Sequence, residues 1–522
     1  MNALKESGTL ADMLRRRADH QPDAPALIYE GRTSSYAELA RRAARVAQGL
    51  AAFGVRPGER VGYLGKNVDC YFELLFGAAN AGAVLVPVNW RLAPPEIAAI
   101  LTDGCIRILF VGRGLGDVAA ALAMSQELRC VSIEGANTAW PDFAAWRDSQ
   151  SATQPSVLSA PTDTVLQMYT SGTTGLPKGV ELTNRNFLAF FSSFGEAGPG
   201  ALAASDVVLV CMPVFHVAGT NLGLAGLAAG ASVVIMEEYE PLRLLELIVR
   251  HGVSCLVLVP AAILMLVQCP AAASADLSSV RILLYGASPI AEALQRQTAA
   301  LFRNARLYHL YGLTEACGAG TILPSELHDP ALGKLRSCGR PYPGFELSIV
   351  DPLGKPLPTG EIGEIVIRSE TVMKGYWNNP EATRAAFFEG GWLRTGDAAY
   401  MDEDGLVYVH DRVKDMIVTG AENVYPAEVE NALYGHPAIA DVAVIGVPDP
   451  RWGEAVKAIV VLREGQRATA DELIAHARQR IAGYKLPKSV DFVAALPRNP
   501  TGKVLRRALR APYWEGRDRQ VS

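Results

Sequence analysis

Short apolar runs alternate with longer helix-like stretches through the first two thirds of the chain, and this alternation restricts the fold more than any other feature. Strands that are buried on both faces are almost continuously apolar, and parallel strands need helices to connect them. The helix-like stretches include residues 36–53 and 241–250. The candidate strands are residues 61–64, 83–87, 106–111, 207–210, 232–236, 255–259 and 281–285. The pattern therefore predicts an α/β fold whose parallel sheets are covered by helices on both faces.

The pattern changes twice toward the C-terminus. A chain of 522 residues is too long for one ordinary core, so more than one domain is expected. From about residue 339, short strands separated by Gly/Pro turns predict a small antiparallel β-barrel or sheet over about 339–411. Beyond Lys414 an α+β unit is predicted, and it ends in a basic tail. We therefore expect an N-terminal domain of residues 1–413, which includes the barrel-like part, and a small C-terminal domain of residues 414–522.

Charge and cysteine usage argue against several classes of protein. The chain has 49 Lys and Arg against 54 Asp and Glu, so no basic surface suggests a nucleic-acid partner. Its eight cysteines are scattered without a Cys-x-x-Cys pair, which is typical of reduced thiols rather than of disulfides or a zinc site. The eight histidines are equally dispersed. We expect a cytoplasmic protein, and the sequence is compatible with a homodimer.

Two uncharged runs, residues 217–236 and 252–275, are long enough to raise the question of a membrane span. Each run is interrupted by glycine, proline or polar residues and contains a β-branched patch. A buried helix with a buried strand explains both runs better. No transmembrane segment is therefore predicted, although peripheral contact with a membrane remains open.

A loop rich in glycine and hydroxyl side chains follows the apolar residues 165–168. Glycines allow close backbone approach to a ligand, and successive backbone N–H groups can hold an anion. The loop lacks the Gly-Lys-Ser/Thr spacing of a Walker A motif, and a solvated linker is the alternative. We predict that the loop binds a polyphosphate through Thr170, Ser171, Gly172, Thr173, Thr174, Gly175 and Lys178.

The order of residues in this loop resembles the phosphate loop of the adenylate-forming superfamily, which comprises acyl-CoA synthetases, adenylation domains and beetle luciferases. Further strings match that family in its own order across about residues 30–510. They are Met-Pro-Val-Phe-His at 212–216, Tyr-Gly-Ala-Ser-Pro at 285–289, Tyr-Gly-Leu-Thr-Glu at 311–315, Trp-Leu-Arg-Thr-Gly-Asp at 392–397, Asp-Arg-Val-Lys-Asp-Met-Ile at 411–417, Gly-Ala-Glu-Asn-Val at 420–424 and Pro-Arg-Asn-Pro-Thr-Gly-Lys at 497–503.

The resemblance implies two half-reactions that use ATP, Mg²⁺ and coenzyme A. A carboxylate attacks the α-phosphate of ATP and expels pyrophosphate, and a thiolate then attacks the acyl-adenylate. Because the first step joins two anions, it requires positioning and neutralisation of charge. By resemblance, Thr170 and Glu315 would also contact the magnesium ion.

The same resemblance implies the nucleotide contacts. Tyr311 would offer its ring to adenine, with Gly312 and Thr314 of the same motif beside the nucleotide. The backbone of Gly286, Ala287 and Ser288 would bind the edge of the adenine. Asp397 would accept hydrogen bonds from the ribose hydroxyls, and Arg412 would reach the same ribose. A core role for Tyr311 and an Asx-turn for Asp397 are the alternatives.

Further catalytic roles are implied near the C-terminus. Lys503 would bridge the carboxylate and the α-phosphate during adenylation. Lys414 matches the hinge about which a mobile C-terminal domain would rotate between the half-reactions. Gly420 and Ala421 would then flank the pantetheine arm; many relatives have two glycines there, so Ala421 departs from the pattern.

Three more residues complete the predicted site. His216 would gate the acyl pocket against the pantetheine tunnel, although a histidine on an apolar segment is commonly a core residue. Arg91 and Lys488 could contact the phosphates of CoA.

The resemblance is to stand-alone acyl-CoA synthetases, such as bacterial fatty-acid–CoA ligases, with a medium- or long-chain fatty acid as the first choice of substrate. The small residues at 316–320 leave volume for such an acid. An aryl or arylpropenoic acid is the alternative. An amino-acid adenylating enzyme is disfavoured because no carrier domain follows the lysine motif and no acidic residue lies near 216–221. A luciferase-like oxygenase and a non-catalytic nucleotide sensor are further alternatives.

Overall fold

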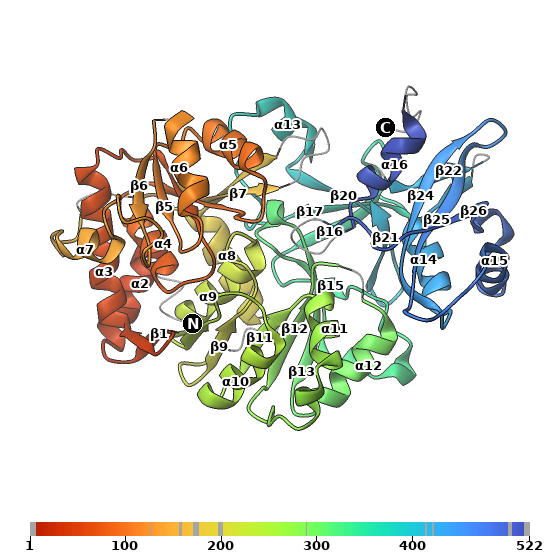
Figure 1. Ribbon diagram of the computed structural model, residues 1–522, viewed down its shortest axis with the longest axis horizontal. Coiled ribbons are helices and arrows are strands. Elements are labelled where there is room, and N and C mark those ends of the chain that lie inside the picture. The colour runs from red at the N-terminus through yellow and green to blue at the C-terminus, as the bar shows by residue number, and fades with distance from the viewer. Residues whose placement is uncertain are drawn as a thin grey trace. The chain divides into compact units, whose positions relative to one another are not determined.

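A computed structural model of the chain describes residues 7–125, 127–155, 159–170, 177–196, 202–288, 290–412, 415–419, 422–498 and 504–515 (Figure 1). The chain packs into two compact units. The first comprises Met1–Glu346 and Ile367–Leu393, and the second comprises Leu347–Val366 and Arg394–Ser522. The predicted domain boundary at residues 413 and 414 lies outside the described residues and stays a prediction.

The larger sheet of the first unit has nine strands within the described ranges, and its centre is parallel. Four of the candidate strands, at 207–210, 232–236, 255–259 and 281–285, are confirmed as neighbouring members of this sheet. The order across the sheet is β15 (Arg340–Pro341), β14 (Gly320–Leu323), β13 (Arg306–Gly312), β12 (Ile282–Gly286), β11 (Cys255–Leu258), β9 (Val207–Val210), β10 (Ser232–Ile235), β1 (Pro25–Tyr29) and β2 (Arg32–Ser35).

The second sheet of this unit has seven strands in the described part of the chain and contains the three remaining candidates, 61–64, 83–87 and 106–111. Strands β3, β4, β5 and β6 pair in parallel, whereas β7 and β8 form an antiparallel hairpin. The order is β18 (Gly375–Tyr376), β8 (Lys178–Thr183), β7 (Thr164–Thr170), β4 (Val84–Val88), β3 (Arg60–Leu64), β5 (Ile108–Val111) and β6 (Arg129–Ser132).

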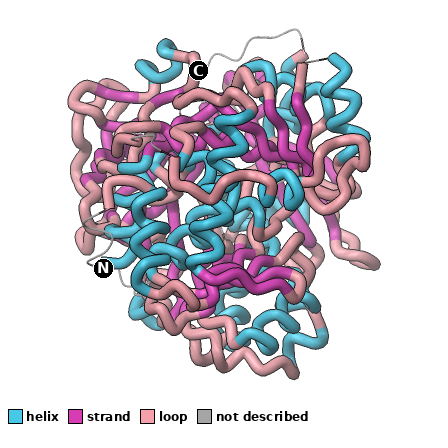
Figure 2. Tube along the Cα trace, turned by 90° about the vertical axis from the view of Figure 1, so that its left-hand side faces the viewer, coloured by secondary structure: helices cyan, strands magenta, loops and turns pink. Residues whose placement is uncertain are grey.

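Helices connect these strands and pack on the sheets, as Figure 2 shows in cyan and magenta. Helix α9 lies close to its neighbours because it contains glycines: a Cβ on Gly223 would stand 2.3 Å from the ring of Phe72. The helices are α2 (Leu10–His20), α3 (Tyr36–Ala52), α4 (Cys70–Asn80), α5 (Pro94–Asp103), α6 (Gly116–Ser125), α7 (Phe143–Asp148), α8 (Asn184–Glu196), α9 (Val217–Ala229), α10 (Pro241–His251), α11 (Pro260–Gln268), α12 (Glu292–Leu301) and α13 (Pro380–Ala385).

The two long uncharged runs divide into separate elements, as predicted. Residues 217–236 form α9 and β10, and residues 252–275 include β11 and α11. Within the described ranges, no helix combines the length and the apolar character needed to cross a membrane.

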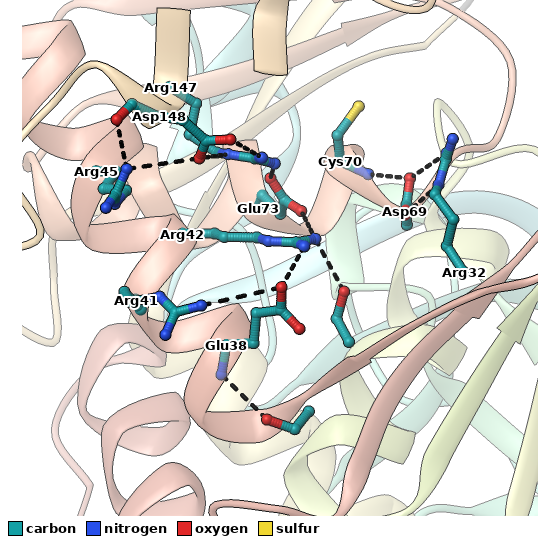
Figure 3. Close-up of polar contacts among 12 residues, drawn as sticks. Arg32, Glu38, Arg41, Arg42, Arg45, Asp69, Cys70, Glu73, Arg147 and Asp148 are labelled. Carbon is teal, nitrogen blue, oxygen red and sulfur yellow. Dashed lines mark hydrogen bonds and ion pairs between the residues drawn. The ribbon is translucent and has the colours of Figure 1, made fainter. Parts of the chain in front are cut away.

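Helices α3, α4 and α7 are joined by a buried carboxylate. Glu73 of α4 is 1% exposed and accepts hydrogen bonds from Arg147 at 2.7 Å and from Arg42 at 3.0 Å (Figure 3). Burial raises the pKa of Glu73, and the two guanidinium groups oppose that shift. Arg147 also pairs with Asp148, and Arg42 with Glu38. Removing one partner from such a buried network is costly because it leaves charge without compensation.

We therefore predict that Glu73→Ala lowers the stability of the first unit by ~3–5 kcal/mol. The measurement is the urea midpoint of its unfolding transition. Glu246→Ala is the matched control, because Glu246 pairs with Arg243 on the exposed side of α10. Equal shifts in the two variants would show that the buried network contributes nothing beyond an ordinary surface ion pair.

The antiparallel part contributes to both units. Its five strands, counted within the described residues, are β16 (Glu346–Val350), β17 (Gly363–Arg368), β20 (Trp392–Met401) and β19 (Phe387–Phe388) in that order, with β21 (Val407–Arg412) paired to β20. The predicted antiparallel region over about 339–411 is thus confirmed as part of an α/β fold.

The C-terminal α+β region is confirmed as well. Its sheet, within the described residues, has the order β23 (Glu422–Val424), β22 (Ile417–Thr419), β25 (Gly453–Leu462) and β24 (Ile439–Asp449), and β26 (Ser489–Phe492) pairs with β25. Helices α14 (Pro426–Tyr434) and α15 (Ala470–Arg478) pack against its core with Val429 and Leu473.

The basic tail expected at residues 503–510 lies largely within helix α16 (Arg506–Trp514). Leu509 and Tyr513 of this helix pack on apolar residues of β24 and β25. Arg510 pairs with Asp415 at 2.8 Å and Arg506 with Glu430 at 2.8 Å. The arginines thus have carboxylate partners within the unit, and sequence position alone did not reveal those partners.

Candidate active site

The phosphate loop connects two strands of a hairpin. Thr170 ends β7, Lys178 begins β8, and the two residues are register partners across the antiparallel pair. The remaining predicted contacts of the loop, Ser171, Gly172, Thr173, Thr174 and Gly175, lie outside the described residues. The structure therefore places the two ends of the loop opposite one another, at the edge of the seven-stranded sheet.

The structure brings the two predicted metal contacts together. Glu315 lies on a 3₁₀ turn (Thr314–Ala316) that follows β13 of the nine-stranded sheet. The hydroxyl of Thr170 donates to Oε1 of Glu315 at 3.4 Å. A carboxylate beside a hydroxyl, at the mouth of a loop expected to hold phosphates, is a set of hard oxygen donors of the kind that Mg²⁺ accepts.

Sequence reasoning missed Tyr376, which lies in the same cluster. Its hydroxyl donates to Oε1 of Glu315 at 2.9 Å, and Nζ of Lys178 lies 4.8 Å from the centre of its ring. The only signal in the sequence is a tyrosine between Gly375 and Trp377, and that pattern is equally typical of packing.

The predicted adenine contacts lie at the carboxyl ends of two neighbouring parallel strands. Gly286 of β12 is the register partner of Leu310, the residue before Tyr311 in β13. A Cβ on Gly286 would stand 2.0 Å from the carbonyl oxygen of Leu310, so only glycine fits. Ala287 follows with a φ of 66°, a conformation that L-residues rarely adopt. Carboxyl ends of parallel strands are the usual ligand site in open α/β sheets.

The end of β13 and the turn that follows it are also close-packed. Gly312 approaches the chain so closely that a Cβ would stand 2.4 Å from the carbonyl oxygen of Gly318. Thr314 begins the 3₁₀ turn that presents Glu315. Tyr311 and Gly312 therefore end strand β13, and Thr314 begins the turn that follows it, beside the end of β12.

A stack of aromatic rings supports the ends of β12 and β13, and sequence reasoning missed it. The rings of Tyr285 and His309 are nearly parallel with centroids 4.9 Å apart, and the Tyr285 hydroxyl lies 2.8 Å from Nε2 of His328. Burial lowers the pKa of His309 to about 4. His309 is therefore neutral near pH 7, which suits a packing role beside the ends of these two strands.

The predicted acyl-pocket residues also come together. His216 is the N-cap of α9, and its Nδ1 accepts a hydrogen bond from the backbone N–H of Ala218 at 3.3 Å. Burial lowers its pKa, so the ring is neutral. Asn221 of α9 donates to the carbonyl of Cys317 at 2.7 Å. A Cβ on Gly318 would stand 3.2 Å from the methyl groups of Val217. The start of α9 therefore packs on the small-residue turn.

In the second unit, Asp397 and Arg412 are register partners across β20 and β21. Asp397 is 6% exposed and lies within strand β20. That location argues against the Asx-turn alternative. Lys414, Gly420, Ala421 and Lys503 all lie outside the described residues.

The two predicted CoA-phosphate contacts have different surroundings. Arg91 forms an ion pair with Glu238 at 3.3 Å and lies 4.8 Å from the ring centre of Trp90. Lys488 is exposed in the second unit. A phosphate at Arg91 would have to compete with Glu238 for the guanidinium group.

Comparison with known proteins agrees with this geometry. Residues 14–377 match the model of the AMP-binding enzyme family, and residues 428–503 match the AMP-binding enzyme C-terminal domain. The chain is 39% identical over 517 residues to a fatty acid–[acyl-carrier-protein] ligase, ScoC, of Streptomyces coeruleorubidus, with 98% of each chain covered. It is 41% identical over 501 residues to a feruloyl-CoA synthase of an Amycolatopsis species, covering 95% of this chain and 98% of the relative.

Among solved structures, a fatty acyl CoA synthetase of Mycobacterium tuberculosis superposes with a TM-score of 0.77 at 36% identity, covering 97% of this chain and 98% of that one. The family matches span both the phosphate hairpin and the C-terminal α+β region. The chain therefore belongs to the AMP-binding enzyme family.

Proposed function

We propose that this protein is an AMP-forming acid–thiol ligase that joins a carboxylic acid to coenzyme A through an acyl-adenylate. The observation that carries the proposal is the cluster of Thr170, Lys178 and Glu315 at the hairpin, within a chain of the AMP-binding family. The positive charge of Lys178 suits the triphosphate of ATP, and the oxygen donors of Thr170 and Glu315 suit the magnesium ion that accompanies it. A nucleotide sensor that had lost catalysis would be expected to lack Glu315 or Lys503, and the sequence has both.

The residues present fit a magnesium ion that is held mainly by substrate. Within the described ranges, no group of three or more His, Cys, Asp or Glu side chains could hold a metal by itself. Mg²⁺ commonly takes one or two protein oxygens and fills its shell with phosphate oxygens and water. Thr170 and Glu315 would supply the protein oxygens. When bound, the ion would neutralise charge on the phosphates of ATP.

The remaining nucleotide contacts are proposed from the sequence resemblance. The backbone after Gly286 and the ring of Tyr311 would bind adenine, and Asp397 with Arg412 would bind the ribose. Contacts of this kind would orient the α-phosphate for in-line attack by the carboxylate, and such positioning lowers the barrier to reaction between two bound reactants.

The C-terminal lysine and the hinge rest on sequence resemblance. Lys503 would neutralise the charge that develops where the carboxylate meets the α-phosphate. Rotation about Lys414 would then replace Lys503 with the segment that contains Gly420 and Ala421, which would flank the pantetheine arm of CoA. His216 is neutral by burial and would separate the acyl pocket from that arm.

For the acid, we propose a medium- or long-chain fatty acid. The small residues from Ala316 to Gly320 face the apolar start of α9, and each CH₂ group of substrate buried there gains ~0.8 kcal/mol. The relatives act on fatty acids and on ferulate by name, so an arylpropenoic acid is the second candidate. A panel of acids assayed for pyrophosphate release separates the two candidates by their kcat/KM values. If acetate had the highest kcat/KM, both candidates would be contradicted.

The acyl acceptor needs its own test, because one relative is named for transfer to an acyl-carrier protein and another for transfer to CoA. We propose CoA as the acceptor. The eight cysteines are all free thiols, which supports a reducing, cytoplasmic location where CoA is available. AMP release is measured with CoA as the only acceptor and, separately, with a phosphopantetheinylated carrier protein as the only acceptor. AMP release with CoA alone would support CoA, and release with the carrier protein alone would contradict it.

Gly318→Ala should shift chain-length preference toward shorter acids. The added methyl group would stand 3.2 Å from Val217, which narrows the space between the turn and α9. Gly333→Ala is the matched control: Gly333 also has a positive φ, of 64°, but a Cβ there meets nothing within 4 Å. Both substitutions put an alanine at a positive φ. If Gly333→Ala changed chain-length preference in the same way as Gly318→Ala, the change would come from backbone strain and not from the narrowed space.

Lys503→Ala should slow adenylation by ~10²–10⁴-fold, the scale of losing one positioned electrostatic group. Acid-dependent exchange between pyrophosphate and ATP measures this step. The variant should still convert supplied acyl-adenylate and CoA to product. Lys355→Ala, on an exposed turn, serves as the control. Loss of both half-reactions together in Lys503→Ala would contradict alternation of two C-terminal domain positions.

A further inference from the structure

Residues 370–377 form a segment, here called the strap, that joins the two halves of the candidate metal site. Within the strap, the N–H of Met373 donates to the carbonyl of Glu315 at 2.8 Å. A few residues on, the N–H groups of Lys374 and Trp377 donate to Glu181 and Gly179 of β8 at 3.0 and 2.7 Å. The strap therefore contacts both the Glu315 turn and the strand that follows the phosphate loop.

The start of the strap is held by a buried side chain. Nδ2 of Asn186, at the beginning of α8, donates to the carbonyls of Glu370 and Val372 at 2.7 and 2.8 Å. Asn186 is 4% exposed. The backbone of the strap is thus fixed before it reaches the site.

The backbone of Tyr376 and the side chain of its neighbour Trp377 are both held in place by contacts. It pairs with Val180 in the short strand β18, and its N–H donates to the hydroxyl of Thr383 at 2.9 Å. The ring of the neighbouring Trp377 lies against Arg60, whose guanidinium carbon is 3.3 Å from the ring centre, and Nε1 of Trp377 donates to the backbone carbonyl of Asp103 at 2.9 Å. The side chain of Tyr376 therefore leaves a rigid edge strand.

The hydroxyl of Tyr376 selects one oxygen of Glu315. Tyr376 donates to Oε1 at 2.9 Å, and Thr170 approaches the same oxygen at 3.4 Å. Oε2 accepts no hydrogen bond from the part of the chain that the structure describes. Two donors on one oxygen fix the rotation of the carboxylate and leave the second oxygen for another partner.

The ring of Tyr376 has a second neighbour. Nζ of Lys178 lies 4.8 Å from the ring centre, within the range of a cation–π contact. Tyr376 thus contacts both the carboxylate of Glu315, which would meet the magnesium ion, and the ammonium group of Lys178, which would meet the phosphates of the same ATP.

We propose that Tyr376 is a positioning residue that orients Glu315 for a magnesium ion and Lys178 for the phosphates of ATP. The inference rests on the proposed function, because it assigns Tyr376 to the same nucleotide site. Partners that orient a metal ligand commonly change metal affinity by ~10–100-fold when they are removed. A purely structural tyrosine would instead affect folding, and its hydroxyl would have no metal-dependent effect.

The test is calorimetric titration of the full chain with ATP, without acid or CoA, in Mg²⁺ and in EDTA. Tyr376→Phe removes only the hydroxyl, so the Kd in Mg²⁺ should rise ~10-fold, while the Kd in EDTA should stay within about twofold. Tyr376→Leu also removes the ring beside Lys178 and should weaken binding in EDTA as well. Thermal unfolding of each variant reports whether the fold is intact.

Tyr408→Phe is the matched control. The Tyr408 hydroxyl donates to Asp402 at 3.1 Å in the second unit, so its loss should leave the Kd in Mg²⁺ unchanged. In a Glu315→Gln background, Tyr376→Phe should add no further loss, because its target carboxylate is already gone.

Two outcomes would overturn the inference: a Tyr376→Phe chain that binds ATP as the unaltered chain does in Mg²⁺, or an equal loss in Mg²⁺ and in EDTA. If the unaltered chain bound no ATP under either condition, the proposed function itself would be refuted along with it. If the unaltered chain bound ATP and only the Tyr376 effect were absent, the proposed function would stand and the inference would fall.

Discussion

The hydrogen bonds to Oε1 of Glu315 connect the two large sheets of the first unit, and the candidate site depends on that connection. Glu315 follows β13 of the nine-stranded sheet, whereas Thr170 and Tyr376 belong to β7 and β18 of the seven-stranded sheet. The turn that would present adenine contacts and the hairpin that would hold phosphates therefore meet at one carboxylate. Ligands of α/β proteins commonly bind beyond the carboxyl ends of strands, which is where these two segments lie.

The rest of the site follows from how tightly the surrounding chain is packed. Gly286 and Gly312 allow backbone approaches that a Cβ would block, and the Tyr285–His309 stack supports the strand ends from below. On the acyl side, Asn221 ties α9 to the turn at Cys317. Packed elements thus position the candidate site residues that the structure describes, and a preorganised transition-state site would require such positioning.

The sequence alone predicted seven central strands of the two large sheets, because buried parallel strands are almost continuously apolar, and it predicted an α+β unit after Lys414. It also placed Glu315 near Thr170 through a resemblance. It did not reveal Tyr376, because the contact depends on β18 pairing at the edge of β8, and an edge pairing of two residues leaves no periodic pattern. It did not reveal that the arginines of helix α16 pair with Asp415 and Glu430, because these partners lie far away in sequence.

The most direct test of this account is a crystal structure of the chain with ATP and Mn²⁺, with the metal located by its anomalous signal. The account predicts an ion about 2 Å from Oε2 of Glu315, with the Tyr376 hydroxyl still on Oε1 and the β- and γ-phosphates beside Lys178. An ion bound away from Glu315, or bound to Oε1 with Tyr376 displaced, would contradict it.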